Sequence, residues 1–150
     1  MNLLECEATF EASPAAVWRV WTDVASWPDW DVSKEIARLD GEFEVGTTGW
    51  AKQRNNLGGL FMITLIEPGK RFLTECPLPV GVGKMIFDHR IEGLDRGRVR
   101  VIKSVEVQGG FAPLFRLVVA PRMRRDIAES LAAMGRRVHS RPRGPASPVS

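Results

Sequence analysis

The 150-residue sequence has no tyrosine, two histidines and two cysteines. The lack of tyrosine removes a common proton donor from any enzymatic mechanism. The cysteines, Cys6 and Cys76, form neither a CxxC motif nor a cluster with histidine, which excludes a zinc site of the usual spacing. We expect both thiols to be reduced and buried, as is usual in a cytoplasmic protein.

Long apolar runs and recognised catalytic motifs are missing as well. No stretch approaches the roughly 20 apolar residues that span a bilayer, and the N-terminus lacks the charged and apolar regions of a signal peptide. The sequence contains no G-x-S-x-G elbow, no metal-ligand spacing and no phosphate-binding glycine loop after a strand. We therefore expect a cytoplasmic protein that uses no cofactor and no metal.

The composition is ordinary for a folded domain, with 44% hydrophobic and 26% charged residues. We expect a single domain at 1–138 and a disordered tail at 139–150, because the tail is rich in proline and serine. The net charge is +3, but the segment from Arg122 to Arg143 holds seven arginines and two acids, giving +5. No basic patch is interleaved with aromatic residues, which argues against nucleic-acid binding. A weak attraction to anionic membrane surfaces is possible, although a solvated helix face explains the arginines too.

The fold prediction depends mainly on a long helical run from Pro113 to about Val138. Apolar residues recur there at steps of three and four, as on one face of a helix: Leu114, Leu117, Val118, Ile127, Leu131, Met134 and Val138. Pro121 lies inside the run and should kink or split the helix, because it removes a backbone hydrogen bond. The rest of the chain supplies strands, so we expect a curved sheet around this helix.

The N-terminal third predicts a strand followed by a short helix. Five small or apolar residues alternate with polar ones: Leu4, Cys6, Ala8, Phe10 and Ala12. Ser13-Pro14 has the pattern of a helix start. The helix should break at Trp27, which Pro28 is expected to force out of helical conformation. Four of the five tryptophans lie between Trp18 and Trp30, where they form core packing or line a cavity.

Further strands follow from alternation and turn signals. The segment 46–54 is polar and contains glycine, as expected of an edge strand that would permit a homodimer. Segments 60–67 and 71–76 flank a Pro-Gly turn, and pairing across it places Ile63 opposite Thr74. The loop 77–83 carries apolar residues, which makes it a candidate lid or a segment packed on the helix.

The hairpin from Met85 to Val107 contains the main polar anomaly. A three-residue loop at 95–97 sets a register in which His89 faces Lys103 on an otherwise apolar face. Burial would disfavour the charged form of both groups, and each would disfavour charge on the other. They are therefore candidates for ligand contact or acid–base chemistry. Alternatively, the Lys103 ammonium reaches an edge of the sheet and His89 bonds to a backbone carbonyl.

The order of elements resembles the START-like or SRPBCC superfamily, the birch-pollen-allergen-like helix-grip fold. The resemblance covers about Leu3 to Val138. It rests on F-E-A-S-P-A-A-V-W-R-V-W-T-D-V-A-S-W-P-D-W-D, on I-E-P-G-K-R-F, on F-D-H-R-I-E and on the length of the last helix. The first motif is similar to bacterial members of the polyketide cyclase/dehydrase and lipid-transport type.

The resemblance implies an α+β fold with about seven antiparallel strands, short helices after the first strand, and a cavity under the long helix. Members include carriers, aromatase/cyclases and hydrolases, so the fold does not fix an activity. The first hypothesis is a carrier for a lipid, isoprenoid or aromatic polyketide. The residues expected to line its cavity are Trp21, Trp30, Phe61, Phe72, Phe87, His89, Lys103, Leu117 and Ile127. The alternative is a cyclase or dehydrase in which His89 is the base and Lys103 holds an enolate, with Asp31 and Glu75 as further candidates.

Overall fold

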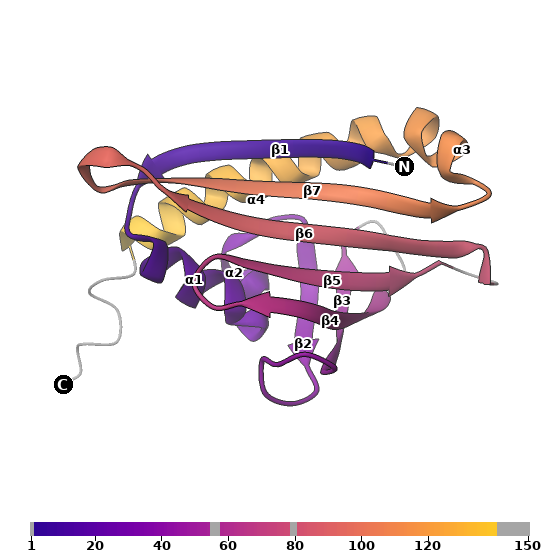
Figure 1. The fold of residues 1–150 in the computed structure, drawn as a ribbon, viewed down its shortest axis with the longest axis horizontal. Coiled ribbons are helices and arrows are strands. Elements are labelled where there is room, and N and C mark those ends of the chain that lie inside the picture. The colour runs from indigo at the N-terminus through magenta and orange to yellow at the C-terminus, as the bar shows by residue number, and fades with distance from the viewer. Residues whose placement is uncertain (1, 55–57, 79–80, 141–150) are drawn as a thin grey trace.

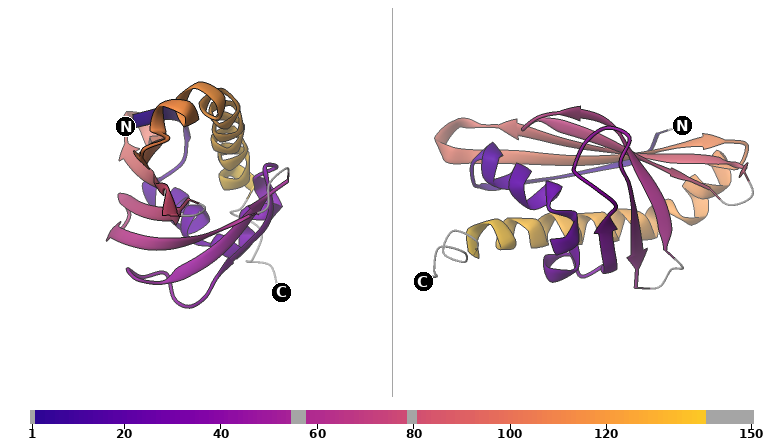
Figure 2. Two further views of the ribbon diagram at one scale, coloured as in Figure 1. Left: turned by 90° about the vertical axis from the view of Figure 1, so that its right-hand side faces the viewer. Right: turned by 90° about the horizontal axis from the view of Figure 1, so that it is seen from below.

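The computed structural model describes residues 2–54, 58–78 and 81–140, and within them one antiparallel sheet curls around a long helix (Figures 1 and 2). The sheet has seven strands in the order β1-β7-β6-β5-β4-β3-β2. Their bounds are β1 Asn2–Glu11, β2 Lys34–Leu39, β3 Thr48–Gln53, β4 Gly59–Glu67, β5 Arg71–Pro77, β6 Gly83–Gly93 and β7 Arg98–Gly109. The expected α+β helix-grip architecture is confirmed.

The helices are α1 Pro14–Thr22, η1 Val24–Ser26, α2 Trp27–Trp30, η3 Asp95–Gly97, α3 Ala112–Val118 and α4 Ala120–Ser140. The start of α1 is as predicted, because Ser13 Oγ accepts a hydrogen bond of 3.1 Å from the Ala16 amide. The expectation for Trp27 was wrong. Its φ of −52° and ψ of −44° are helical, and Pro28 is accommodated in the first turn of α2, where no amide hydrogen bond is lost.

The β6–β7 hairpin has the predicted register throughout. Phe87 pairs with Val105, His89 with Lys103 and Ile91 with Val101. The loop that sets this register contains two left-handed residues, with φ of 64° at Arg96 and 70° at Gly97. The inward face of β7 buries its valines completely, so Lys103 lies in an otherwise apolar row.

The β4–β5 hairpin follows the predicted register only at a distance from its turn. Next to the turn Glu67 pairs with Arg71, which is one residue out of step with the register predicted from the pairing of Ile63 with Thr74. A bulge between Ile63 and Leu65 then restores that predicted pairing. The bulge inserts one extra residue into β4, which alternation alone does not reveal.

The predicted edge strand lies inside the sheet. β3 pairs with β2 on one side and with β4 on the other, so β1 and β2 are the edges. The glycine that suggested an edge has a packing reason instead. A Cβ atom on Gly49 would lie 2.5 Å from Cζ of Phe61 and 2.6 Å from the carbonyl oxygen of Arg38.

The C-terminal helix divides where Pro121 indicated, between α3 and α4. In α4 the predicted face is buried against the sheet through Ile127, Leu131, Met134 and Val138. The prediction fails in α3, where Leu114, Leu117 and Val118 are exposed by 55%, 77% and 64%. Helix α3 turns at the split and lies beside the ends of β7 and β1, where it presents this face to solvent (Figure 1).

Helix α4 runs to Ser140. The division into a domain at 1–138 and a tail at 139–150 stays a prediction. The rest of the expected tail, 141–150, lies outside the described residues, as do positions 79–80 of the expected lid. Within the described part of the chain, no helix is both long and apolar enough to cross a membrane.

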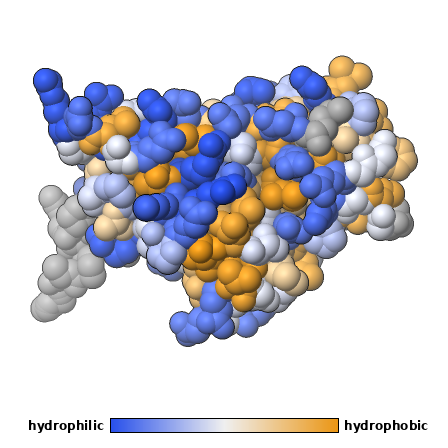
Figure 3. Space-filling view, viewed as in Figure 1, coloured by the Kyte–Doolittle hydropathy of each residue, from blue (hydrophilic) through white to orange (hydrophobic). Residues whose placement is uncertain are grey.

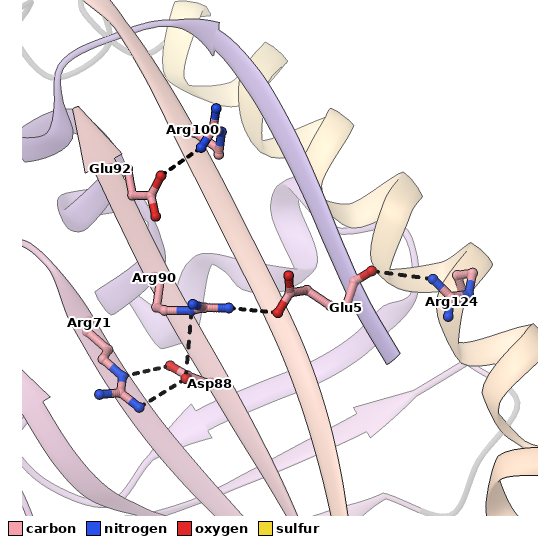
Figure 4. Close-up of polar contacts among 7 residues, drawn as sticks. All are labelled: Glu5, Arg71, Asp88, Arg90, Glu92, Arg100 and Arg124. Carbon is pink, nitrogen blue, oxygen red and sulfur yellow. Dashed lines mark hydrogen bonds and ion pairs between the residues drawn. The ribbon is translucent and has the colours of Figure 1, made fainter. Parts of the chain in front are cut away.

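The outer face of the sheet carries ion pairs on four strands, β1, β5, β6 and β7 (Figure 4). Arg71 forms two hydrogen bonds to Asp88, of 3.0 and 3.1 Å, and Arg90 donates one of 2.8 Å to Glu5. Arg124 of α4 donates to the backbone carbonyl of Glu5 at 3.3 Å. This face is therefore charged and exposed to solvent, and the candidate functional residues lie on the opposite, concave face.

Candidate functional site

A cavity of about 440 Å³ lies between the concave face of the sheet and α4. Strands β2 to β7 form one wall, and the first residue of α2, the residue after α2 and the first half of α4 form the other. The apolar part of the lining consists mainly of Trp27, Ala51, Phe61, Met85, Phe87, Met123 and Ile127. The polar part consists of Asp31, Ser33, Lys34, Gln53, Thr74, Cys76, His89, Lys103, Asp126 and Ser130.

The structure brings five of the nine predicted lining residues to this cavity. They are Phe61, Phe87, His89, Lys103 and Ile127. Trp21, Trp30 and Phe72 are buried in the core behind the cavity wall, and Leu117 is exposed on α3. Leu117 does not line the cavity, because α3 turns at the split and leaves this side chain in solvent. Glu75 points outward, where it accepts a hydrogen bond of 2.8 Å from Lys84.

Lys103 contributes the unpaired cation of the cavity. Among the described residues its ammonium has no hydrogen-bond or ion-pair partner, and it lies 5.3 Å from the centre of the Phe87 ring. Burial, together with the charge of Lys34, lowers the pKa of Lys103 from 10.5 to about 8. The charged form still dominates at neutral pH, so the cavity presents a positive charge that forms no direct ion pair with a described residue.

His89 is held as a neutral ring. It is only 2% exposed, it stacks on Phe72 with ring centres 4.1 Å apart, and the Trp21 ring meets it edge-on. Its Nδ1 lies 3.3 Å from the carbonyl oxygen of Phe72, which can only accept, so Nδ1 carries the proton. Burial and the charge of Lys103 lower the pKa of His89 well below its usual value.

Asp31 anchors a buried polar network that the sequence reading did not identify. Its Oδ2 accepts a hydrogen bond of 2.7 Å from the hydroxyl of Ser130 on α4, and its Oδ1 accepts one of 2.6 Å from the hydroxyl of Ser33. Lys34 Nζ lies 3.9 Å from Oδ2. Burial raises the pKa of Asp31, but Lys34 and the two hydroxyls outweigh it and hold the pKa below its usual value. Asp31 is therefore a charged, fully occupied acceptor.

One signal in the sequence pointed to this network. Ser130 lies three residues after Ile127 and four before Met134, so it is a polar residue on the apolar face of α4. Lys34 gave no such signal, because it is the first residue of a strand. Trp27 was not among the predicted lining residues, although it lines the cavity. Its ring stacks on that of Phe61, with ring centres 6.1 Å apart.

Cys76 lines the same cavity as a protonated thiol. Burial raises its pKa from 9.0 to about 11. Both cysteines are free, as expected, but both are only partly buried, which differs from the expectation of buried thiols. Among the described residues no group of three or more histidine, cysteine or acidic side chains is placed to hold a metal ion.

A curled antiparallel sheet closed by a C-terminal helix over an apolar cavity defines the START-like, helix-grip class of protein. The chain belongs to the polyketide cyclase/dehydrase and lipid transport family, whose model matches residues 3–139. No curated protein matches the sequence.

Solved structures share the fold along nearly the whole chain. The Zhui aromatase/cyclase from Streptomyces sp. R1128 has a TM-score of 0.76 at 15% identity and covers 96% of this chain and 97% of its own. TTHA0849 from Thermus thermophilus has a TM-score of 0.75 at 15% identity, covering 93% and 99%. Ara h 8.0201 has a TM-score of 0.68 at 19% identity, covering 91% and 97%. Identities this low establish the fold alone.

Proposed function

We propose that the chain is a carrier for a small amphipathic molecule, which it binds in the cavity with an apolar body and one anionic end beside Lys103. The observation that carries the proposal is an apolar cavity of about 440 Å³ with a cation that has no partner among the described residues. Cavities of roughly 300–1,000 Å³ with few polar groups suit drug-sized ligands. A lipid, an isoprenoid acid or an aromatic polyketide would meet these requirements.

The electrostatics of the cavity support an anionic end rather than a neutral one. Asp31 neutralises Lys34 at 3.9 Å and accepts hydrogen bonds from Ser33 and Ser130. Lys103 forms no ion pair with a described residue, although the charge of Asp31 acts on it at longer range, and burial makes its charged form costly. A ligand carboxylate, phenolate or enolate would offset that cost, whereas a hydrocarbon would leave it in place.

The first test identifies what the protein carries. Native mass spectrometry of freshly purified protein, followed by extraction, should recover a stoichiometric amphipathic acid. Dodecanoate and dodecanol then serve as matched probes, with intrinsic tryptophan fluorescence, to which Trp27 in the cavity lining contributes, as the readout. Dodecanoate should bind more tightly, and Lys103→Met should weaken its binding about tenfold or more, since a hydrogen bond to a charged group contributes about 1.5–3 kcal/mol.

The control variant is Lys70→Met, at the exposed turn after β4, which should bind both probes normally. An equal loss of dodecanoate and dodecanol binding in Lys103→Met would contradict the anionic anchor. A protein that is empty on purification and binds neither probe would contradict the carrier function as a whole.

A second candidate function, a cyclase or dehydrase, is favoured by one observation. His89 and Lys103 lie directly opposite each other on β6 and β7, and both line the cavity. With Nδ1 donating to Phe72, Nε2 of His89 carries the lone pair that a general base needs, while Lys103 would stabilise an enolate oxygen. The lowered pKa of His89 makes it a weak base, so we rank this function second.

Turnover separates the two functions. The protein is incubated with an aromatic polyketide precursor bearing a free β-diketone, and the products are followed by chromatography and mass spectrometry. An enzyme would lose product formation in His89→Ala while it kept precursor binding. A carrier would release the precursor unchanged in both the original protein and the variant.

A further inference from the structure

The face of α3 that points to solvent is strongly apolar. Phe111, Leu114, Leu117 and Val118 are exposed by 51%, 55%, 77% and 64%. The last three recur at helical spacing, so they form one stripe, while Ala112 on another side of the helix is buried. Figure 3 shows apolar side chains at the end of the molecule where Figure 1 places α3. Exposed apolar stripes of this kind mark interaction surfaces.

The same segment is positively charged. Residues 111–125 contain four arginines and no acidic residue. Arg116, Arg122 and Arg125 are exposed, and none of them forms an ion pair with a described residue. Arg124 is engaged with the Glu5 carbonyl. The segment therefore joins an apolar stripe to three arginines that no carboxylate neutralises.

The surface adjoins a second hollow, of about 410 Å³, which Val118 and Arg122 line together with Val32 and Arg54. This second hollow shares Ser33, Gln53, Met123 and Asp126 with the cavity described above. A partner held by α3 would thus lie next to a hollow that adjoins the cavity.

We propose that α3 and the first turn of α4 dock on the surface of an anionic lipid bilayer, with the apolar stripe among the acyl chains and the arginines on the lipid headgroups. Apolar area and arginine charge contribute together to this kind of interfacial binding. No helix in the described residues can span a bilayer, so the contact would be interfacial. Charge favours lipid over a second copy of this chain, because a symmetric contact would bring like-charged arginines together.

Vesicle sedimentation tests the proposal with the full chain. Vesicles of phosphatidylcholine alone are compared with vesicles containing phosphatidylglycerol, at low and high salt. The protein should sediment with the anionic vesicles at low salt and be released as salt screens the arginines. The double variant Leu114→Ser/Leu117→Ser should bind at least tenfold more weakly. Each of Arg116→Gln and Arg122→Gln should weaken binding about fivefold, from roughly 1 kcal/mol per arginine near an anionic surface.

Matched controls lie elsewhere on the molecule. Val45→Ser/Leu60→Ser removes two other exposed apolar side chains, which are 60% and 45% exposed. Arg96→Gln/Arg98→Gln removes two arginines at the turn of the β6–β7 hairpin, at the end of the sheet opposite α3 (Figure 1). Both controls should bind vesicles as the original protein does. Circular dichroism verifies that each variant is folded.

Three outcomes would overturn the proposal. These are binding to neutral and anionic vesicles alike, equal losses in the α3 variants and the controls, and an oligomer that Leu114→Ser/Leu117→Ser converts to monomer without vesicle binding. None of these measurements uses the cavity ligand, so the docking surface can fail while the carrier function stands.

Discussion

Ser130 on α4 donates a hydrogen bond of 2.7 Å to Asp31, a residue 99 positions earlier that follows α2. This bond fastens the long helix to the segment that carries Trp27 and Lys34 into the cavity. We expect Ser130→Ala to lower the free energy of unfolding by about 1–3 kcal/mol, because it removes a partner from a buried carboxylate. Urea denaturation measures the change. Ser104→Ala on β7 is the control and should stay within about 0.5 kcal/mol; equal losses would refute a specific role for the bond.

His89 should make the protein sensitive to mild acid. Its pKa is lowered in the folded state, so as pH falls through the usual value of 6.5 the unfolded chain binds a proton that the folded protein does not. Stability should therefore fall from pH 7 to pH 5. His89→Phe keeps a ring against Phe72 and should lose less stability over this range in urea titrations. His139→Phe, at the exposed end of α4, should behave like the original protein.

Lys103 should give a pH dependence of the same sign in mild alkali, because its pKa is also lowered in the folded protein. Its pKa is about 8 in the folded protein, against the usual value of 10.5 that applies to the unfolded chain. Above pH 8 the unfolded chain therefore holds the proton more tightly, and the stability of the folded protein rises with pH. The window to measure is pH 8–9, because above pH 9 the raised pKa of Cys76, about 11, acts in the other direction. Lys103→Met should abolish the rise and stabilise the ligand-free protein at pH 7 by a few kcal/mol at most, since each pKa unit is about 1.4 kcal/mol. A rise that persists in Lys103→Met would assign it to another group.

Gly49 tests the packing behind the cavity wall. Gly49→Ala would place a methyl group 2.5 Å from the Phe61 ring, which has to shift within the wall that it forms. We expect a stability loss of about 1–3 kcal/mol and weaker dodecanoate binding. Gly110→Ala, where no atom lies within 4 Å of the added Cβ, is the matched control. An unchanged melting temperature in Gly49→Ala would show that Phe61 moves freely.

The sequence by itself determined the features that depend on local period and turn chemistry. Strict alternation around the 95–97 loop placed His89 opposite Lys103, and helical spacing with Pro121 predicted a long, divided C-terminal helix. Together with the motif at 10–31, these patterns predicted the helix-grip fold. They succeed because side-chain direction along a strand or helix is fixed by backbone geometry over a few residues.

The tertiary structure alone decided which of these side chains meet. Periodicity placed Leu117 on an apolar face, but whether that face is covered depends on how α3 packs after the helix divides. The sequence analysis assigned other tryptophans to the cavity lining, but not Trp27, which the structure places there. Asp31 and Ser130 come together only when α4 docks on the sheet, and the bulge in β4 arises from pairing between strands. Such contacts follow from packing over long separations, which no local pattern encodes.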